Sequence, residues 1–352
     1  MSTYKITVTP AGPYFFGNEK SFRYPGQNNG GAYSNSYFIK SEDVPSQSTI
    51  LGALRFILIP HKNFPDDSEK IKENAEAVGK SGFNIELPAL NGFGKIKSIS
   101  PLFITCGEKR IIPLPLNHNT TDKSGMYKPL ADLKPVETVN GKKYFADDFD
   151  VKEGITSDYV EVSEEPAIIK KDDIFNSSVR VGINRESQKK GFFKKEYKAL
   201  RRGFSFAVYA DIDEELDGRN ETVCLGQGKS PFSFCFAKTS DTEYDDFKES
   251  IAVMLGKFSG NENLIYCFGD AFTNGNPCDN TMFAVFNTKD FRTFRTDQKG
   301  KIAKDGILYR LVKSGSVFIT AEGGTDEWVK QHTNEYAQTI GYNHFIISEG
   351  KK

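Results

Sequence analysis

A basic segment followed at once by an apolar strand dominates this chain. Between Arg180 and Arg202 the segment carries nine Lys or Arg and two Glu, whereas the whole chain has a formal net charge of −1. Residues 204–210 then alternate apolar side chains with the two-residue period of a core strand. The basic segment therefore lies at the surface, next to the core. Positive charge concentrated in one segment of a protein that is not basic overall indicates a site for a polyanion.

The basic segment predicts a long, exposed β-hairpin. Residues 179–184 and 193–200 have strand composition, and a polar turn separates them. Cations spaced along both strands suit successive phosphates, and Phe192, Phe193 and Tyr197 offer rings for base stacking, which favours single-stranded RNA. The alternative is a solvated edge hairpin that uses lysine against aggregation. An edge needs only one or two lysines, so a cluster of this size favours binding.

The length of 352 residues predicts two domains, and a hydrophobic content of 38% is sufficient for two cores. We place the domain boundary near residue 239. The predicted N-terminal domain spans 1–238, with an insertion at about 62–178 and the basic hairpin at 179–202, and the C-terminal domain spans 239–352.

The N-terminal residues predict the opening half of a ferredoxin-like βαβ unit. Residues 4–9 alternate as a strand, residues 21–36 have the composition of a loop, and a capped helix begins after Pro45. The apolar stripe of this helix consists of Ile50, Leu51, Leu54, Ile57 and Leu58.

The start of this helix has two interpretations. Gln47 and Ser48, together with Arg55, have the chemistry to bind a phosphate, because free N–H groups and the helix dipole favour an anion there. Ordinary capping by Ser46 or Ser48 explains the same residues.

An acidic tract at 147–173 contains ten Asp or Glu and three Lys. A solvated linker is one interpretation, and a surface that docks another protein is the other, since an acidic surface repels RNA.

Nothing in the sequence predicts catalysis or a cofactor. The five Cys form no C-x-x-C pair and the four His are scattered, so we expect reduced thiols and no metal site. A Walker A motif is absent, which leaves nucleotide hydrolysis without support. His61 is the one candidate general acid or base for RNA cleavage, but a lone His beside Pro60 is more often incidental.

The sequence predicts a cytoplasmic protein without membrane attachment. The first ten residues lack the features of a secretory signal, and the longest apolar run, 50–60, is interrupted by Arg55 and is too short to span a bilayer.

Nine short segments, taken in order, carry a resemblance to a known family. They read TVTPAGPYFFG, PSQSTILGALR, GKIKSISPLFI, RIIPLPLN, RVGINRES, KKEY, GFSFAVY, SGSVFIT and GYNHFI. Together they resemble the RAMP superfamily of CRISPR-associated proteins, and within it most closely the family that supplies the third subunit of the type III-B Cmr effector complex.

This resemblance implies an α+β fold with two tandem ferredoxin-like (RRM-like) domains, long insertions and a protruding β-hairpin. It implies a non-catalytic subunit that holds the 5′ tag of the crRNA and docks on the large polymerase/cyclase-like subunit and on the backbone RAMP subunit, with target RNA contacted indirectly. A RAMP endoribonuclease that processes crRNA precursor is the alternative, and a purely structural adaptor is a third.

The resemblance also implies RNA-binding residues. On the helix and the hairpin they are Gln47, Ser48, Arg55, Arg180, Gly182, Ile183 and Arg185. The basic tip of the hairpin, with Lys189, Lys190, Lys194 and Lys195, is expected to reach toward the guide or the neighbouring subunit, and Tyr197 is the stacking candidate already named among the RNA-binding residues. The glycine-rich loop of the superfamily is present only in part, as Gly341-Tyr342-Asn343, and this glycine alternatively serves a tight turn.

Overall fold

The computed structural model describes residues 1–23, 37–62, 67–88, 92–119, 128–129, 134–138, 141–145, 157–184, 191–226, 228–257, 263–292, 294–296, 302–304, 307–320 and 323–350. Within these ranges no helix is both long and apolar enough to cross a bilayer.

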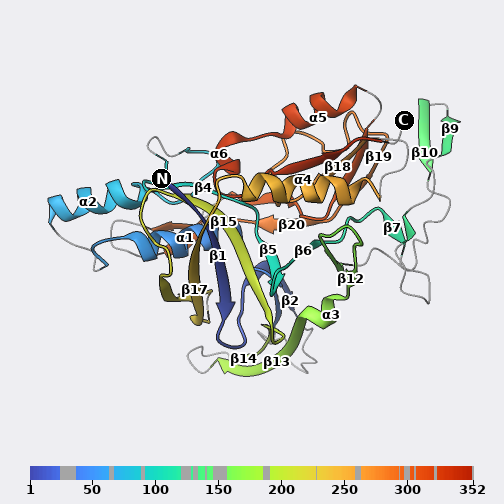
Figure 1. The fold of residues 1–352 in the computed structure, drawn as a ribbon. Coiled ribbons are helices and arrows are strands. Elements are labelled where there is room, and N and C mark those ends of the chain that lie inside the picture. The colour runs from blue at the N-terminus through green and yellow to red at the C-terminus, as the bar shows by residue number, and fades with distance from the viewer. Residues whose placement is uncertain are drawn as a thin grey trace, which may run out of the picture.

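A nine-stranded sheet, the main sheet, organises the first half of the chain (Figure 1). Its strand order is β12-β11-β6-β5-β15-β1-β17-β16, and β4 also pairs with β15. The bounds are β1 Ser2–Pro10, β4 Ile96–Ile99, β5 Phe103–Cys106, β6 Lys109–Pro113, β11 Tyr159–Glu161, β12 Ile168–Ile169, β15 Phe204–Ile212, β16 Asn220–Leu225 and β17 Ser230–Thr239.

A four-stranded sheet, the C-terminal sheet, organises the second half. It has the order β19-β24-β18-β25 and is antiparallel throughout. Its strands are β18 Asn263–Cys267, β19 Phe283–Val285, β24 Val317–Thr320 and β25 Phe345–Ser348.

Both sheets contain the ferredoxin-like strand order, in which the first strand lies between the third and the fourth. In the main sheet this set is β5-β15-β1-β17, and in the C-terminal sheet it is β19-β24-β18-β25. Each set keeps one helical crossover, α1 (Gln47–Leu58) in the first and α5 (Gly324–His332) with α6 (Glu335–Gln338) in the second. The predicted α+β fold with two ferredoxin-like units is therefore confirmed.

The main sheet is covered on both faces because its strands carry apolar residues on both sides. Ile6 and Val8 of β1 pack with α1 in one core cluster. Tyr209 of β15 packs on the opposite face with Phe247 of α4 (Glu243–Leu255) and Tyr266 of β18. The second cluster thus joins the two halves, and the boundary near residue 239, at the turn between β17 and α4, remains a prediction.

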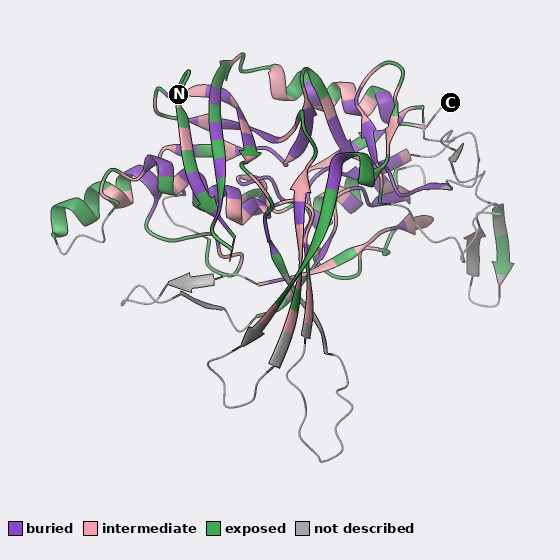
Figure 2. Cartoon of the chain, turned by 90° about the horizontal axis from the view of Figure 1, so that it is seen from below, coloured by how far each residue is buried: buried purple, intermediate pink, exposed green. Residues whose placement is uncertain are grey.

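A second four-stranded sheet, which we call the platform, leaves the body of the molecule (Figure 2). Its order is β13-β14-β3-β2, and its strands are β2 Gly17–Arg23, β3 Tyr37–Ser41, β13 Phe175–Asn184 and β14 Gly191–Leu200. Strand β14 pairs antiparallel with β13 and parallel with β3.

The remaining elements are short or peripheral. Helix α2 (Ser68–Val78) buries only its last two residues, and α3 (Lys171–Ile174) precedes β13. Four strand pairs lie outside the large sheets: β7 His118–Asn119 with β8 Lys128–Pro129, β9 Lys134–Thr138 with β10 Gly141–Phe145, β20 Thr288–Phe291 with β23 Tyr309–Val312, and β21 Phe294–Thr296 with β22 Ile302–Lys304.

Two sequence-based expectations are corrected here. The loop predicted at 21–36 overlaps β2, and the predicted exposed hairpin is present but forms half of a four-stranded sheet, because β3 adds to β14. In the acidic tract, residues 157–173 are not a linker, since β11 and β12 extend the main sheet. The part of the tract before residue 157 lies outside the described residues.

Candidate nucleic-acid interface

The register between β13 and β14 decides which side chains of the platform share a face. Arg180 lies opposite Lys195, and Gly182 lies opposite Phe193. Because directly opposed residues of an antiparallel pair project to the same side, these residues lie on one face of the platform, together with Tyr197. We call Arg180, Gly182, Phe193, Lys195 and Tyr197 the aromatic–basic face.

Cations and rings alternate in space on the aromatic–basic face. The guanidinium carbon of Arg180 lies 4.5 Å from the centre of the Tyr197 ring, and Lys195 Nζ lies 5.4 Å from the centre of the Phe193 ring. Phe193 and Tyr197 are both half-buried. The arrangement offers charge for phosphates and ring surface for bases within one strand pair.

A buried ring supports this face from the body of the molecule. Phe15, in the segment between β1 and β2, is 1% exposed and lies 5.4 Å from the Tyr197 ring and 5.2 Å from Lys195 Nζ. Sequence reasoning missed this residue as part of the interface. The aromatic run at 14–16 is visible in the sequence, but no periodicity connects it to a strand near residue 197.

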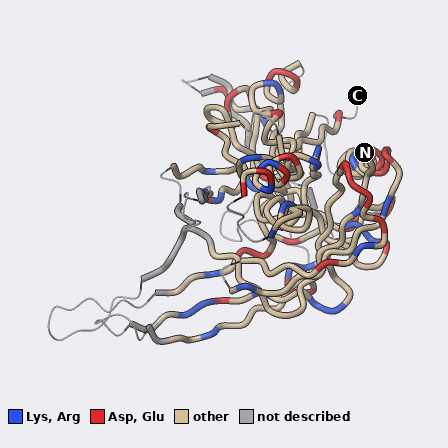
Figure 3. Tube along the Cα trace, turned by 90° about the vertical axis from the view of Figure 1, so that its left-hand side faces the viewer, with Lys and Arg blue, Asp and Glu red and all other residues tan. Residues whose placement is uncertain are grey.

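The positive charge of the aromatic–basic face is not neutralised by the residues that the structure describes. Within them, neither Arg180 nor Lys195 forms an ion pair, although Lys198 of the same segment does. Glu196 projects to the other face, where it pairs with Lys198 at 2.8 Å. Lys and Arg accordingly mark the strands of the platform in Figure 3.

The opposite face of the platform differs in character. It exposes Val179 by 55% and Val181 by 62%, and Lys194 projects to this side. The strand position of Ile183 belongs to the same face by register. Arg185, Lys189 and Lys190, also predicted as RNA contacts, lie outside the described residues.

The three predicted helix residues are engaged inside the fold. Gln47 is 5% exposed, and its Nε2 donates to the carbonyl of Ser100 at 3.4 Å. The backbone N–H of Ser48 donates to the hydroxyl of Tyr342 at 3.4 Å, and Ser46 caps the helix by accepting from Thr49 N. The start of α1 is thus capped by Ser46 and contacted by Tyr342 of the C-terminal segment.

Arg55 serves a neighbouring helix. Its Nε donates to the carbonyl of Val78 at 2.8 Å, and its Nη2 donates to the carbonyl of Gly79 at 3.1 Å. Both acceptors lie at the C-terminal end of α2, where carbonyl groups lack helical partners. Burial lowers the pKa of the guanidinium, which nevertheless stays charged. The structure does not bring these helix residues together with the aromatic–basic face.

Gly341 of the partial glycine-rich loop is a packing position. Its φ is +91°, and a Cβ there would lie 2.5 Å from the carbonyl oxygen of Ser100 and 2.7 Å from Gln47 Nε2. The tight-turn interpretation therefore describes this glycine, and the buried Tyr342 that follows it contacts α1.

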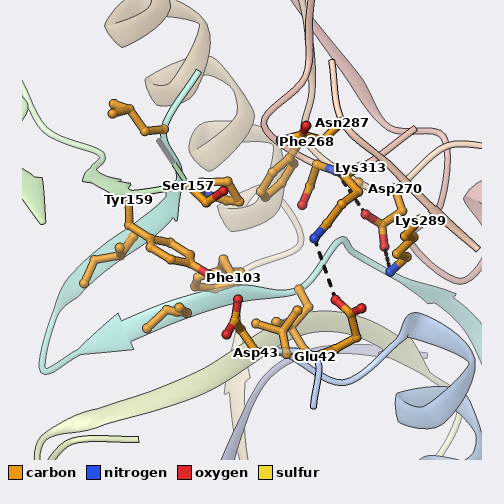
Figure 4. Close-up of a pocket in the computed structure, with 18 of the residues that line it drawn as sticks. Glu42, Asp43, Phe103, Ser157, Tyr159, Phe268, Asp270, Asn287, Lys289 and Lys313 are labelled. Atoms are coloured by element: carbon orange, nitrogen blue, oxygen red, sulfur yellow. Dashed lines mark hydrogen bonds and ion pairs between the residues drawn. The ribbon is translucent and has the colours of Figure 1, made fainter. Parts of the chain in front are cut away.

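A cavity of about 100 Å³ lies between the base of the platform and the second half of the chain (Figure 4). Glu42 and Asp43, which follow β3, line it together with Asp270, Lys289 and Lys313. Lys313 Nζ lies 3.7 Å from Glu42, and Lys289 pairs with Asp270. The lining carries four acidic side chains and two lysines, and each of the two lysines pairs with one of the acids. Within the described ranges, no cluster of three or more His, Cys, Asp or Glu is suited to a metal ion.

His61, the candidate acid or base, is held by α2. Its Nε2 lies 2.5 Å from Glu73 Oε2, and its backbone N–H and carbonyl both bond to the Asn74 side chain at 3.0 Å. Through these contacts, His61 connects α2 to the segment that follows α1.

Comparison with known proteins relates this chain to one protein family. The family described as CRISPR-associated protein (Cas_Cmr3) matches residues 6–252, well over half of the chain. The chain belongs to the Cmr3 family of CRISPR-associated proteins. The resemblance recognised in the sequence is therefore confirmed, and the matched residues of this Cmr3 family chain include α1 and every strand of the platform.

Other comparisons add little to this Cmr3 family assignment. No curated protein matches the chain. Among solved structures, the crystal structure of the Csm3–Csm4 subcomplex in the type III-A CRISPR-Cas interference complex is similar, with 11% identity, coverage of 90% of this chain and 92% of that chain, and a TM-score of 0.37. At this identity and TM-score, the assignment rests on the family match alone.

Proposed function

We propose that this chain is a non-catalytic RNA-binding subunit of a type III-B CRISPR effector complex that anchors the 5′ tag of the crRNA. The observation that carries the proposal is the aromatic–basic face, with two cations and two half-buried rings on one strand pair. Family membership supports the CRISPR context.

Phosphate contacts and base stacking make separate contributions in this proposal. Arg180 and Lys195 attract the RNA backbone and supply affinity that falls with salt. Phe193 and Tyr197 hold unstacked bases of a single-stranded end, and each stacked base contributes about 1–3 kcal/mol. The platform thereby positions an RNA end without requiring a base-paired partner.

The predicted contacts differ in how directly the geometry supports them. Arg180, Lys195 and Tyr197 are the core of the site, with Gly182 as the position that admits the Phe193 ring. Lys194 and Ile183 lie on the opposite face by register. Contact by Arg185, Lys189 and Lys190 stays a prediction, and contact by Gln47, Ser48 or Arg55 would require each to leave its present partner.

The proposed partners follow from family membership. They are the crRNA, the large polymerase/cyclase-like subunit and the backbone RAMP subunit, with target RNA contacted through the guide. The proposed compartment is the cytoplasm. A structural adaptor without RNA contact is the competing function, and it predicts that the platform crosslinks to protein only.

The test is the RNA content of the purified effector complex. Arg180→Glu with Lys195→Glu is expected to strip crRNA from a complex that still assembles, because two attractive contacts become repulsive. Lys248→Glu is the matched control, since Lys248 also lies over an aromatic ring, at 4.9 Å from Tyr244, but on α4. Equal crRNA content in all complexes would contradict the proposal.

Absence of catalysis is part of the proposal and needs its own test. A repeat RNA incubated with the wild-type chain in the absence of metal is expected to remain intact. Cleavage that disappears in His61→Ala would instead support the endoribonuclease alternative, with Glu73 as the partner of the imidazole.

A further inference from the structure

Lys198 of the basic segment lies outside the aromatic–basic face and is held inside the protein. Lys198 is 8% exposed, and its Nζ bonds to Ser177 Oγ at 2.8 Å and to Glu196 Oε1 at 2.8 Å. Asp43 Oδ1 lies 3.4 Å from the same ammonium. Burial on its own lowers the pKa of Lys198, but Glu196 and Asp43 raise it by more, so the side chain stays charged. Its charge is used within the protein.

The partners of Lys198 come from three places in the chain. Ser177 and Glu196 belong to β13 and β14, and Asp43 follows β3. Lys198 is therefore the point at which both hairpins of the platform are joined by side chains. Lys171 also pairs with Asp43, at 2.5 Å, which connects the segment leading into β13.

Tyr14 connects this point to the core. Its backbone N–H donates to the carbonyl of Lys198 at 2.7 Å, and its carbonyl accepts from Lys198 N at 3.0 Å. Its hydroxyl donates to the carbonyl of Asp43 at 2.6 Å, and its ring is fully buried against Phe206 of the main sheet. We call Tyr14, Asp43 and Lys198 the root clamp.

Beyond the root clamp the support from the core decreases, with Phe15 still packed against Tyr197 and Lys195. Residue 198 of β14 is buried, whereas residue 194 is exposed and residues 193 and 195–197 are half-buried. On β13, residues 176–181 are exposed. The strands beyond the clamp extend from the body (Figures 2 and 3). Contacts at the base must therefore fix the direction in which the platform extends.

We propose that Lys198 is a positioning residue that fixes the direction of the platform through Asp43 and Glu196, so that RNA held on the aromatic–basic face meets the rest of the effector complex in one orientation. The inference rests on the proposed function. It gives different roles to two lysines only three residues apart, because Lys195 contacts RNA and Lys198 does not.

Two kinds of binding distinguish a positioning residue from a contact. A short single-stranded RNA of about 12 nucleotides probes the aromatic–basic face of the full chain alone. For this probe Lys198→Met is expected to leave the dissociation constant and the salt slope unchanged, whereas Lys195→Met lowers the slope by about 0.7. Lys198→Arg, which keeps the charge, is expected to match the wild type in every assay.

Retention of crRNA in the assembled complex gives the second readout. If Lys198→Met leaves the platform in the competent direction for a tenth of the time, the apparent dissociation constant for crRNA rises about tenfold. Spin labels at Ser178 and Glu327, attached through noncanonical amino acids because the chain has five Cys, report the direction. We expect one narrow distance distribution in the wild type and a broad one in Lys198→Met.

A second variant guards against a folding defect. Lys198→Met leaves Glu196 without its cation, and Lys198→Met with Glu196→Gln removes both charges while Asp43 keeps Lys171. A narrow, wild-type distance distribution in the double variant would overturn the inference, and so would a lowered salt slope for the short RNA. If the short RNA fails to distinguish Lys195→Met from the wild type, the proposed function fails, and the label distances still decide the role of Lys198.

Discussion

At Gly182, a hydrogen in place of a side chain lets the Phe193 ring lie across β13. A Cβ at this position would lie 2.2 Å from the tip of that ring, so an alanine forces the ring to move. The aromatic–basic face thus depends on one position that carries neither charge nor ring.

Gly182→Ala is predicted to weaken RNA binding without changing its salt dependence. Displacing the Phe193 ring removes about 1 kcal/mol of stacking, roughly a fivefold loss of affinity, while the cations remain. Fluorescence anisotropy titrations at several salt concentrations measure both quantities. Gly12→Ala is the control, because a Cβ at Gly12 meets nothing within 4 Å. An unaltered affinity in Gly182→Ala would show that the ring does not take part in binding.

Residue types on the basic segment could be read from the sequence, but their partners could not. Alternation along a strand assigns Arg180 and Lys195 to an open surface. Lys198 and Arg55 are also cations. Only the fold shows that Lys198 pairs with Asp43 and that Arg55 donates to the carbonyls at the end of α2. A cation reveals its role through contacts made by residues far away in the sequence.

At the scale of elements, the start of α1 and the C-terminal loop form one packed junction. Gly341, with its φ of +91°, allows the loop backbone to approach Ser100 and Gln47, and Tyr342 reaches the first turn of the helix. This junction covers the start of α1, which the sequence indicated as one possible phosphate site.

Gly341→Ala is predicted to lower the free energy of unfolding by about 2 kcal/mol or more. The left-handed backbone conformation disfavours a side chain, and the added methyl would lie 2.5 Å from the carbonyl oxygen of Ser100. Urea denaturation measures the change. Gly52→Ala, in the middle of α1 with open space around it, is expected to raise stability by up to about 1 kcal/mol. Equal stability of the two variants would argue against the packed junction.

Elements with strong local signals were predicted, and elements made by distant pairing were not. The apolar stripe and the Ser46 cap predicted helix α1, and the alternation of apolar residues predicted strands β1 and β15. The platform needs β3 to pair in parallel with β14 across more than 150 residues. A loop-like composition before β3 concealed that partner.

At the scale of the whole molecule, the two ferredoxin-like units share a core, and the Tyr266 hydroxyl of the second unit donates to the carbonyl of Pro113 in the first at 2.6 Å. A buried histidine lies inside the second unit. His344 connects α4 to α6: its ring lies 2.9 Å from the Tyr244 hydroxyl, and its Nε2 donates to the carbonyl of Gln338 at 3.0 Å. Burial lowers the pKa of His344 to about 4. The pKa of His332 is also lowered by burial.

Stability is predicted to fall as the pH is lowered from neutral towards 4. The unfolded chain binds a proton at His344 below a pKa of about 6.5, while the folded chain resists protonation until about 4. The contribution is fully present above 6.5 and its loss approaches about 3 kcal/mol near pH 4. Urea denaturation across this window, compared with His344→Gln, isolates the effect. A variant whose stability falls as steeply as the wild type would contradict it.

The α+β class and the opening half of the first ferredoxin-like unit were predictable because strand and helix periods alternate along the chain, whereas the second unit was expected from the family resemblance. The packing of the two halves was not predictable, because the sequence shows that Tyr209 and Phe247 are apolar but not that they contact each other. The predicted boundary near 239 illustrates the limit: a turn is visible there, while the shared core across it is not.

The salt dependence of single-stranded RNA binding tests the central claim most directly. We predict that Arg180→Ala and Lys195→Ala each lower the slope of log affinity against log salt by about 0.7 relative to the wild type. This is the value for one phosphate contact on a single strand. Arg310→Ala and Lys248→Ala, exposed cations on β23 and α4, are predicted to keep the wild-type slope. The same slope for all five proteins would contradict the account.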